Sequence, residues 1–342
     1  FVKSRQRFQS VYCIDAREES FRRHVEEVAP DTETFAAAGF FGVAMYYRGA
    51  ATARFATSCP VVTKPRNWVT EEVAYPLLDS HRRRRRVRQT LGAVTRQLHL
   101  GSRRLTSGAL LMMLAGVLAS IPLVARVLFP RWTARVRKAA GGLVALPNVT
   151  RLRLEHSSVN TSIENKQVGF TLAEMADIGE RMLRDIGLTS DFARLVLFLG
   201  HASSSVNNPH KSAYDCGACT RPGGANARAI ASILNDIRVR TTLAQRGLQI
   251  PPDTYFLGGQ HDTCDDSITF SDLDLLPVSH FDYFELANES LKVACERNSH
   301  ERCRLFEIPT ATFSFAEAKS HSERRAQDLT QARAEYGNAT NA

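Results

Sequence analysis

The sequence lacks a secretory signal-peptide pattern, an internal repeat and a cysteine framework of the kind found in disulfide-rich secreted proteins. It has an odd number of cysteines, seven in 342 residues, at positions 13, 59, 216, 219, 264, 295 and 303. Thiols in this number and spacing are typical of a reducing compartment, where they bind metals or take part in catalysis. We therefore expect cytoplasmic exposure. Because the first residue is Phe, we also expect the chain to be a segment of a longer protein.

Acidic residues are missing from one long stretch. Between Ser80 and Leu154 there are 16 Lys and Arg residues and no Asp or Glu. Since the whole chain has a net charge of +9, the remainder has a net charge of −7 (9 minus 16). The arginine run at 82–86 has no interleaved aromatic residues and no known binding module beside it, which argues against nucleic-acid recognition. A solvated basic face is the simplest alternative.

The same stretch contains Leu105 to Ala125, 21 residues without a charge. This length is sufficient to span a bilayer, but Ser, Gly and Pro interrupt the segment and Arg flanks it on both sides, which removes any orientation cue. We expect a helix that docks on a membrane partner or an anionic membrane surface, with a transmembrane span as the alternative. Residues 80–154 are thus predicted to form a basic and apolar helical insertion.

The remaining pattern alternates short apolar runs with amphipathic stretches, which predicts an α/β fold with a mostly parallel central sheet. We expect strands at 10–14, 35–48, 194–200 and 254–259, and helices at 18–28, 171–186 and 223–244. A discontinuous domain of residues 1–79 and 155–315 would hold the sheet, and 316–342 would form an exposed helical tail.

Reactive side chains stand where three of these strands end. Cys13, Asp15 and Arg17 alternate, so an extended backbone would project them from one face. His201 follows the second strand, and the third runs into the polar segment 260–266. Because ligands of α/β sheets bind beyond the carboxyl ends of the strands, we expect these groups to converge.

A zinc site is the chemistry that these residue types favour. Cys13, His201 and Cys216 would supply two thiolates and an imidazole, and catalytic zinc sites have three protein ligands with a fourth position open to water. Asp15 would reach either the metal or Arg17. Bound Zn²⁺ lowers the pKa of water to about 7 and makes hydroxide available near neutral pH.

Other interpretations stay open. Cys216 and Cys219 form a Cys-x-x-Cys pair that suits half a zinc knuckle or a redox motif, and the zinc site as a whole suits a structural role. A zinc-dependent hydrolase would use Asp15 or Asp262 as general base, with oxyanion donors from the glycines at 223–224. We expect a supporting or core role for the remaining candidates, which are Cys219, Cys264, His210 and His261.

The segment from Cys13 to Arg17 resembles the Cys-x-Asp-x-Arg element of β-class carbonic anhydrases. Together with the motifs at 200–201, 214–219 and 258–266, the chain is similar over about residues 8–310 to the DabA family. That family is the soluble subunit of the two-part DAB system for inorganic-carbon accumulation.

The resemblance implies a set of site residues. Zinc would be bound by Cys13, Asp15, His201 and Cys216, and Arg17 would pair with Asp15 in a gating dyad. Asp15 would alternate between ligating zinc and pairing with Arg17, which frees a position for water. In the anhydrases the His and second Cys are close in sequence, whereas fifteen positions separate His201 from Cys216. This spacing means that free hydration activity need not follow, and the resemblance to the family implies that the isolated chain is not an active anhydrase.

The resemblance also implies partners and a location. We expect CO₂ to enter a pocket walled by Phe40, Phe41 and Val43 and to be attacked by zinc hydroxide, giving bicarbonate. A membrane-embedded, DabB-like proton-translocating subunit would drive the reaction in one direction. The chain would then be a peripheral protein on the cytoplasmic side of the cell (inner) membrane, and Leu105–Ala125 is the segment expected to dock.

Overall fold

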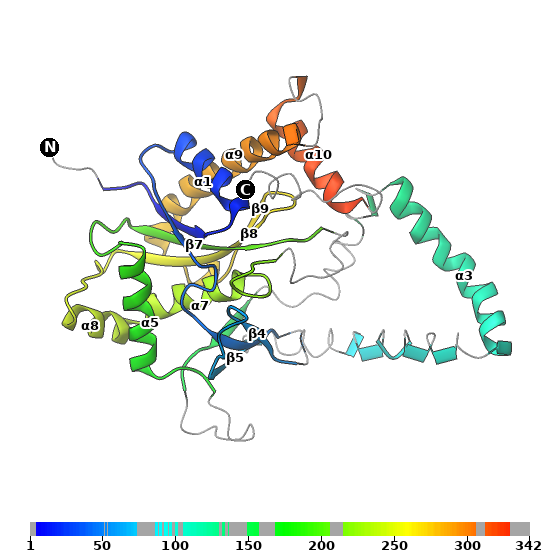
Figure 1. Cartoon of the computed structure of the whole chain (residues 1–342), viewed down its shortest axis with the longest axis horizontal. Helices are drawn as coiled ribbons and strands as arrows, with labels where there is room; N and C mark the ends of the chain where they lie inside the picture. Colours follow the sequence, from blue (N-terminus) through cyan, green and yellow to red (C-terminus); the bar gives the residue numbers. More distant parts are fainter. Residues whose placement is uncertain are drawn as a thin grey trace.

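Two β-sheets organise the computed structural model of the chain (Figure 1). The structure describes residues 5–73 except 51 and 53, parts of 86–136 including all of 105–129, then 149–156, 168–205, 215–305 and 312–328. The strands are β1 Gln9–Cys13, β2 Glu33–Ala37, β3 Met45–Arg48, β4 Ala56–Ser58, β5 Asn67–Val73, β6 Thr150–Arg153, β7 Leu195–Ala202, β8 Tyr255–Asp262 and β9 Ser267–Phe270. The helices are α1 Ala16–Val28, α3 Leu105–Leu128, α5 Leu172–Asp185, α7 Gly224–Asn235, α8 Ile237–Gln245, α9 Phe281–Leu305 and α10 Phe315–Gln327.

The first sheet carries the expected parallel strands. Its order is β2-β1-β7-β8-β9, and only β9 runs antiparallel to its neighbour. Every residue of β7 is buried, as its continuous apolar sequence predicts for a strand covered on both faces. The predicted α/β fold with a mostly parallel sheet is therefore present, and the carboxyl ends of β1, β7 and β8 lie at one edge.

Helices cover both faces of this sheet because side chains alternate along each strand. Val11 and Phe198 belong to a core cluster shared with α5, α7 and α8. Tyr12 and Leu197 belong to a second cluster shared with α1 and α9. Figure 1 shows α1 and α9 on one side of the sheet and α5, α7 and α8 on the other. The strand ends are thus held between two packed helical layers.

The second sheet was not predicted. Its order is β4-β3-β5-β6, with β3 and β5 parallel and the other pairs antiparallel. The single strand expected over 35–48 is wrong, because it is divided between β2 in the first sheet and β3 in the second. Phe41 and Gly42 have φ angles of 48° and 73°, and this left-handed pair turns the chain between the sheets.

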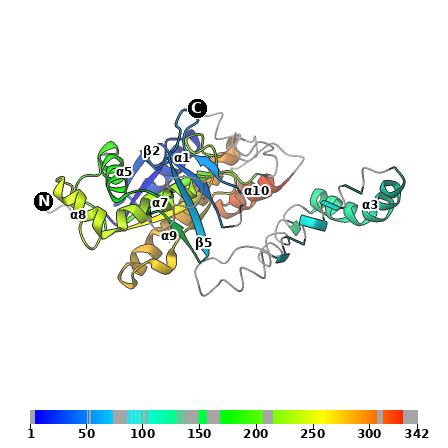
Figure 2. The same ribbon diagram turned by 90° about the horizontal axis from the view of Figure 1, so that it is seen from below.

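Helix α3 lies within the predicted insertion of residues 80–154 and projects away from the sheets in both views (Figures 1 and 2). Several of its apolar side chains are exposed, among them Met113, Val117 and Ile121. Within the described part of the chain, we find no helix with the length and apolar character needed to cross a membrane. The arginines at 82–85 lie outside the described residues.

The C-terminal helix is more buried than expected. We predicted an exposed helical tail over 316–342, but α10 buries one face whose members are Ala318, Ser322 and Ala326. This face packs on α9, where the Cys303 thiol contacts the Ala318 carbonyl at 3.6 Å. Helix α10 therefore belongs to the folded body. Residues 329–342 lie outside the described part.

Candidate metal centre

Strand β1 ends at Cys13, and helix α1 follows after a short turn in which Asp15 is the N-cap residue. The Asp15 carboxylate accepts a hydrogen bond from the Arg17 backbone N–H at 3.0 Å, as N-cap residues do. The helix begins at Ala16, so the extended alternation predicted for Cys13, Asp15 and Arg17 stops at Asp15. Arg17 instead turns back from the first helical turn and binds Asp15 through Nε at 2.7 Å and Nη2 at 3.0 Å.

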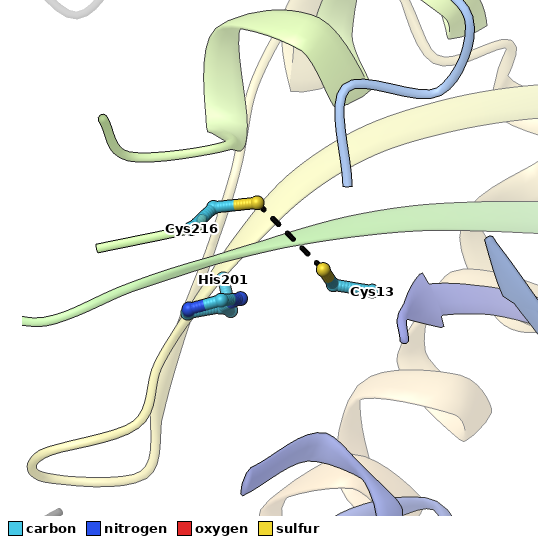
Figure 3. A group of neighbouring side chains, drawn as sticks. All are labelled: Cys13, His201 and Cys216. Atoms are coloured by element: carbon cyan, nitrogen blue, oxygen red, sulfur yellow. Dashed lines mark hydrogen bonds between the residues drawn. The ribbon is translucent and has the colours of Figure 1, made fainter. Parts of the chain in front are cut away.

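Three of the predicted metal ligands lie together. The Sγ atoms of Cys13 and Cys216 are 3.6 Å apart, although 203 positions separate the residues in sequence. These two sulfurs and one ring nitrogen of His201 all lie within 4.8 Å of one another, and all three residues are buried. Figure 3 shows the three side chains converging from the ends of β1 and β7 and from the loop before α7. The convergence expected from the strand ends is observed for Cys13 and His201, whereas the group of donors includes no residue of the segment 260–266.

The geometry of the three donors fits a zinc ion. Two Zn–S bonds of about 2.3 Å at a tetrahedral angle place their sulfurs about 3.8 Å apart, close to the observed separation of the Cys13 and Cys216 sulfurs. The Nδ1 atom of His201 is buried and has no hydrogen-bond partner among the described residues. A soft donor set of two thiols and an imidazole suits Zn²⁺ better than Mg²⁺ or Ca²⁺.

Gly39 leaves the space that the two thiols occupy. A Cβ atom at this position would lie 2.5 Å from the Cys216 sulfur and 2.7 Å from the Cys13 sulfur. A carbon atom does not approach a sulfur atom this closely without a covalent bond, so any larger residue would displace both donors. The backbone therefore approaches the two thiols closely at Gly39, where the absence of a side chain leaves room for the candidate metal centre.

Hydrogen bonding polarises the thiols. Donation from the thiols of Cys13 and Cys219 lowers the pKa of Cys216, whereas hydrogen bonding to Cys216 together with burial raises the pKa of the other two. Burial alone would raise the pKa of Asp15, but the Arg17 guanidinium outweighs it and lowers that pKa. Asp15 is therefore an anion paired with Arg17.

Asp15 stands outside the group of three donors in this arrangement. Its Oδ2 atom is 3.7 Å from the Nε2 atom of His201, and the Nη2 atom of Arg17 is 2.7 Å from the same nitrogen. Asp15 and Arg17 therefore form an ion pair, and a gating role for this pair remains a prediction. Ligation of the metal by Asp15 remains a prediction.

Backbone packing positions His201 and the loop that contains Gly39. Gly200 lies against the backbone of Gly223, and the Gly223 N–H donates to the His201 carbonyl at 2.9 Å. The buried side-chain amide of Asn226 donates to the carbonyls of Phe40 and Val43, at 3.3 and 2.6 Å. Sequence analysis missed Asn226, because a helical Asn has no local signal that it holds a distant loop.

The other candidate residues have different surroundings. Cys219 packs beside Cys13 and Cys216 without joining the donor group, and Cys264 is buried 3.1 Å from the Ser203 hydroxyl. His261 pairs with Glu18 in the interior. These three places agree with the supporting or core role that we expected, and His210 lies outside the described residues.

The predicted apolar pocket needs a correction. Phe41 and Val43 are fully buried in the core cluster shared with α5 and α7, so they do not wall a pocket. Their backbone turn directs them into the sheet interface. Phe40 is the member of the predicted trio that packs against the three cysteines of the site.

Comparison with known proteins shows the family to which the chain belongs. A family model described as "Probable inorganic carbon transporter subunit DabA" matches residues 2–342. The chain belongs to the DabA family. It is 45% identical to the probable inorganic carbon transporter subunit DabA 2 of Rhodopirellula baltica over 99% of this chain and 32% of the relative. It is also 42% identical to the corresponding probable subunit of Methylococcus capsulatus, over 98% of this chain and 32% of the relative.

The chain thus spans about a third of the length of the curated relatives that it matches. No solved structure matches it.

Proposed function

We propose that this chain is the metal-holding part of an inorganic-carbon uptake complex, in which CO₂ and water become bicarbonate and a proton. The observation that carries the proposal is the group formed by Cys13, His201 and Cys216, with Asp15 held beside it by Arg17. The names of the DabA relatives, which describe inorganic carbon transporter subunits, support the substrate class.

Zn²⁺ is the metal that we propose for this group. Bound there, it would supply Lewis acidity, which lowers the pKa of water toward neutrality. Cys13, His201 and Cys216 would hold it, and three protein ligands are the number typical of catalytic zinc sites. Gly39 would keep the sulfurs at the spacing that the ion requires.

Asp15 and Arg17 would control access to the fourth position. The Asp15 side chain is 23% exposed and the Arg17 side chain 10%, so the pair lies between the buried donors and solvent. While Arg17 holds the carboxylate, the position stays open; release of Asp15 toward the donors would close it. Proton movement through the partner would bias this exchange, so that hydration runs in one direction and bicarbonate accumulates.

A membrane-embedded, DabB-like proton-translocating subunit is the partner that we propose. Helix α3 supports this assignment, because it projects from the body (Figure 2) and several of its apolar side chains, such as Met113, Val117 and Ile121, are exposed. Apolar side chains on a projecting helix are buried when it docks in an apolar groove. The chain would then be peripheral, on the cytoplasmic side of the cell membrane.

Two rival functions receive less support from the geometry. A structural-zinc adaptor would use a closed set of three thiols and an imidazole, and Cys219 stands outside the donor group. A hydrolase would need free oxyanion donors at Gly223 and Gly224, and the Gly223 N–H is already bonded to the His201 carbonyl.

The decisive experiment uses the full-length protein co-expressed with its membrane partner in cells that lack carbonic anhydrase. We expect growth in ordinary air with the wild-type chain and none with Cys13→Ala, His201→Ala or Cys216→Ala. Purified complexes should contain one zinc per wild-type chain and almost none in the three variants. Stoichiometric zinc in all three would refute the ligand assignment, and growth without zinc would refute the proposed chemistry.

A further inference from the structure

A cavity of about 720 Å³ lies beside the candidate metal centre. One wall is the chain segment around Ile14, Ala37, Ala38 and Phe40, and helix α5 forms the opposite wall with residues such as Ile178. Most of its lining side chains are alanine, isoleucine, phenylalanine or methionine, while the charged side chains of α5 that reach it are exposed. The cavity is therefore lined mostly by apolar side chains, opens to solvent and has charged groups at its rim.

The cavity and the metal centre share a wall. Ile14 follows Cys13 directly, and its N–H donates to the Ala37 carbonyl at 2.8 Å, while Cys13 and Ala37 are partners in the register of β1 and β2. Phe40 belongs to both sides: it lines the cavity and packs against the buried thiols of the site. The Phe40 side chain is thus the partition between the apolar space and the metal donors.

The mostly apolar lining favours the entry of uncharged molecules over that of anions. An uncharged molecule can enter an apolar cavity without losing strong hydration, whereas an anion that enters it loses hydration and gains few hydrogen bonds. The Asp15–Arg17 side of the centre is polar and partly exposed, so charged species have a separate approach. We propose that the cavity is the entrance for an uncharged gas, CO₂, and that Phe40 is the gate through which it reaches the metal centre. This inference rests on the proposed function for the identity of the gas.

The test measures access to the thiols and needs neither zinc nor inorganic carbon. Full-length protein is stripped of metal with a chelator and treated with methyl methanethiosulfonate, which is small and uncharged, and modification of Cys13 and Cys216 is followed by mass spectrometry. Phe40→Ala should raise the rate about tenfold, equivalent to about 1.4 kcal/mol in the barrier to access. Ala38→Phe, which fills the cavity beside Phe40, should lower it by a similar factor.

A matched control is Phe55→Ala, which removes another half-buried phenylalanine, one that packs edge-on against Trp68 and does not line the cavity. This variant should react like the wild type. The anionic reagent 2-sulfonatoethyl methanethiosulfonate should show no acceleration in Phe40→Ala. Equal acceleration of both reagents would overturn the assignment of an apolar entrance, and unchanged rates in Ala38→Phe would overturn the cavity as the route.

The outcomes separate this inference from the proposed function. If thiol access follows the predictions but cells carrying Phe40→Ala and Ala38→Phe grow like the wild type in air, the cavity is an entrance for something other than CO₂, and the inference is refuted. If thiol access follows them while zinc is absent from the wild-type complex, the proposed function fails and the entrance stands. Should Phe40→Ala not fold, Ala38→Phe decides the question alone.

Discussion

His261 on β8 and Glu18 on α1 form a fully buried ion pair, in which the His261 Nδ1 atom lies 3.0 and 2.9 Å from the two Glu18 oxygens. On the other side of the ring, Asp266 lies 3.4 Å from Nε2 and binds Arg302 at 2.6 Å. Glu18 directly follows Arg17. The pair therefore fixes the first turn of α1, and with it the Asp15–Arg17 dyad, against the central sheet.

The pH dependence of stability should report this pair. Burial alone would lower the pKa of His261, but the carboxylates of Glu18 and Asp266 raise it from 6.5 to about 10. Because the folded pKa is the higher one, the stabilisation is complete below pH about 6.5 and is lost as pH rises toward 10. His261→Gln should lower the free energy of unfolding by about 3–5 kcal/mol at pH 6.

Chemical denaturation of the full-length protein at pH 6 to 10 checks this prediction, with the difference between wild type and His261→Gln shrinking across the range. His24→Gln is the control, because the partners of His24, Glu27 and Glu301, are partly exposed. This substitution should lower the free energy of unfolding by about 1 kcal/mol or less. A difference that stays constant from pH 6 to 10 would mean that His261 is neutral in the folded protein.

Gly39→Ala should strongly weaken metal binding although it removes no ligand. The new Cβ would lie within 2.7 Å of both sulfurs, so Cys13 and Cys216 must move apart. We expect the zinc content of the purified complex, measured by elemental analysis, to fall by about tenfold or more, as supporting residues of metal sites show. Gly217→Ala is the matched control, since a Cβ there meets nothing within 4 Å. Full zinc in Gly39→Ala would contradict the assigned centre.

Asn226→Asp should weaken the centre through the loop that carries Gly39. A carboxylate in place of the amide cannot donate to the carbonyls of Phe40 and Val43, and leaving buried polar groups unpaired costs about 1–3 kcal/mol. The free energy of unfolding and the affinity for zinc, measured on the same protein, should both fall. Asn235→Asp, at the opposite end of α7, breaks a bond to the Phe256 carbonyl and should reduce stability alone. Equal zinc affinity in both variants would show that Asn226 does not support the metal centre.

Arg17→Gln tests the gating dyad. Without the guanidinium, Asp15 loses its bonds of 2.7 and 3.0 Å and is free to turn toward the donors. We expect zinc to be retained while bicarbonate uptake by cells falls at least about tenfold, which corresponds to about 1.4 kcal/mol. Arg23→Gln removes an exposed arginine of the same helix and should leave uptake unchanged. Loss of zinc in Arg17→Gln would show instead that the arginine supports the metal site.

The sequence by itself determined the local elements and the order of the reactive groups. The apolar run of β7 and the capping residues Thr171 and Glu174 of α5 act on their immediate neighbours, so their structure follows from pattern. The placement of Cys13 and His201 near the ends of parallel strands also follows, because parallel strand ends share an edge.

Only the tertiary structure decided which groups meet. The contacts of Cys216 with Cys13, of Gly39 with both thiols and of Glu18 with His261 join residues far apart in sequence. The division of 35–48 between two sheets likewise depends on how those sheets pack. Such contacts are determined by the packing of whole layers, and a linear pattern contains neither the loop paths nor the side-chain volumes that set them.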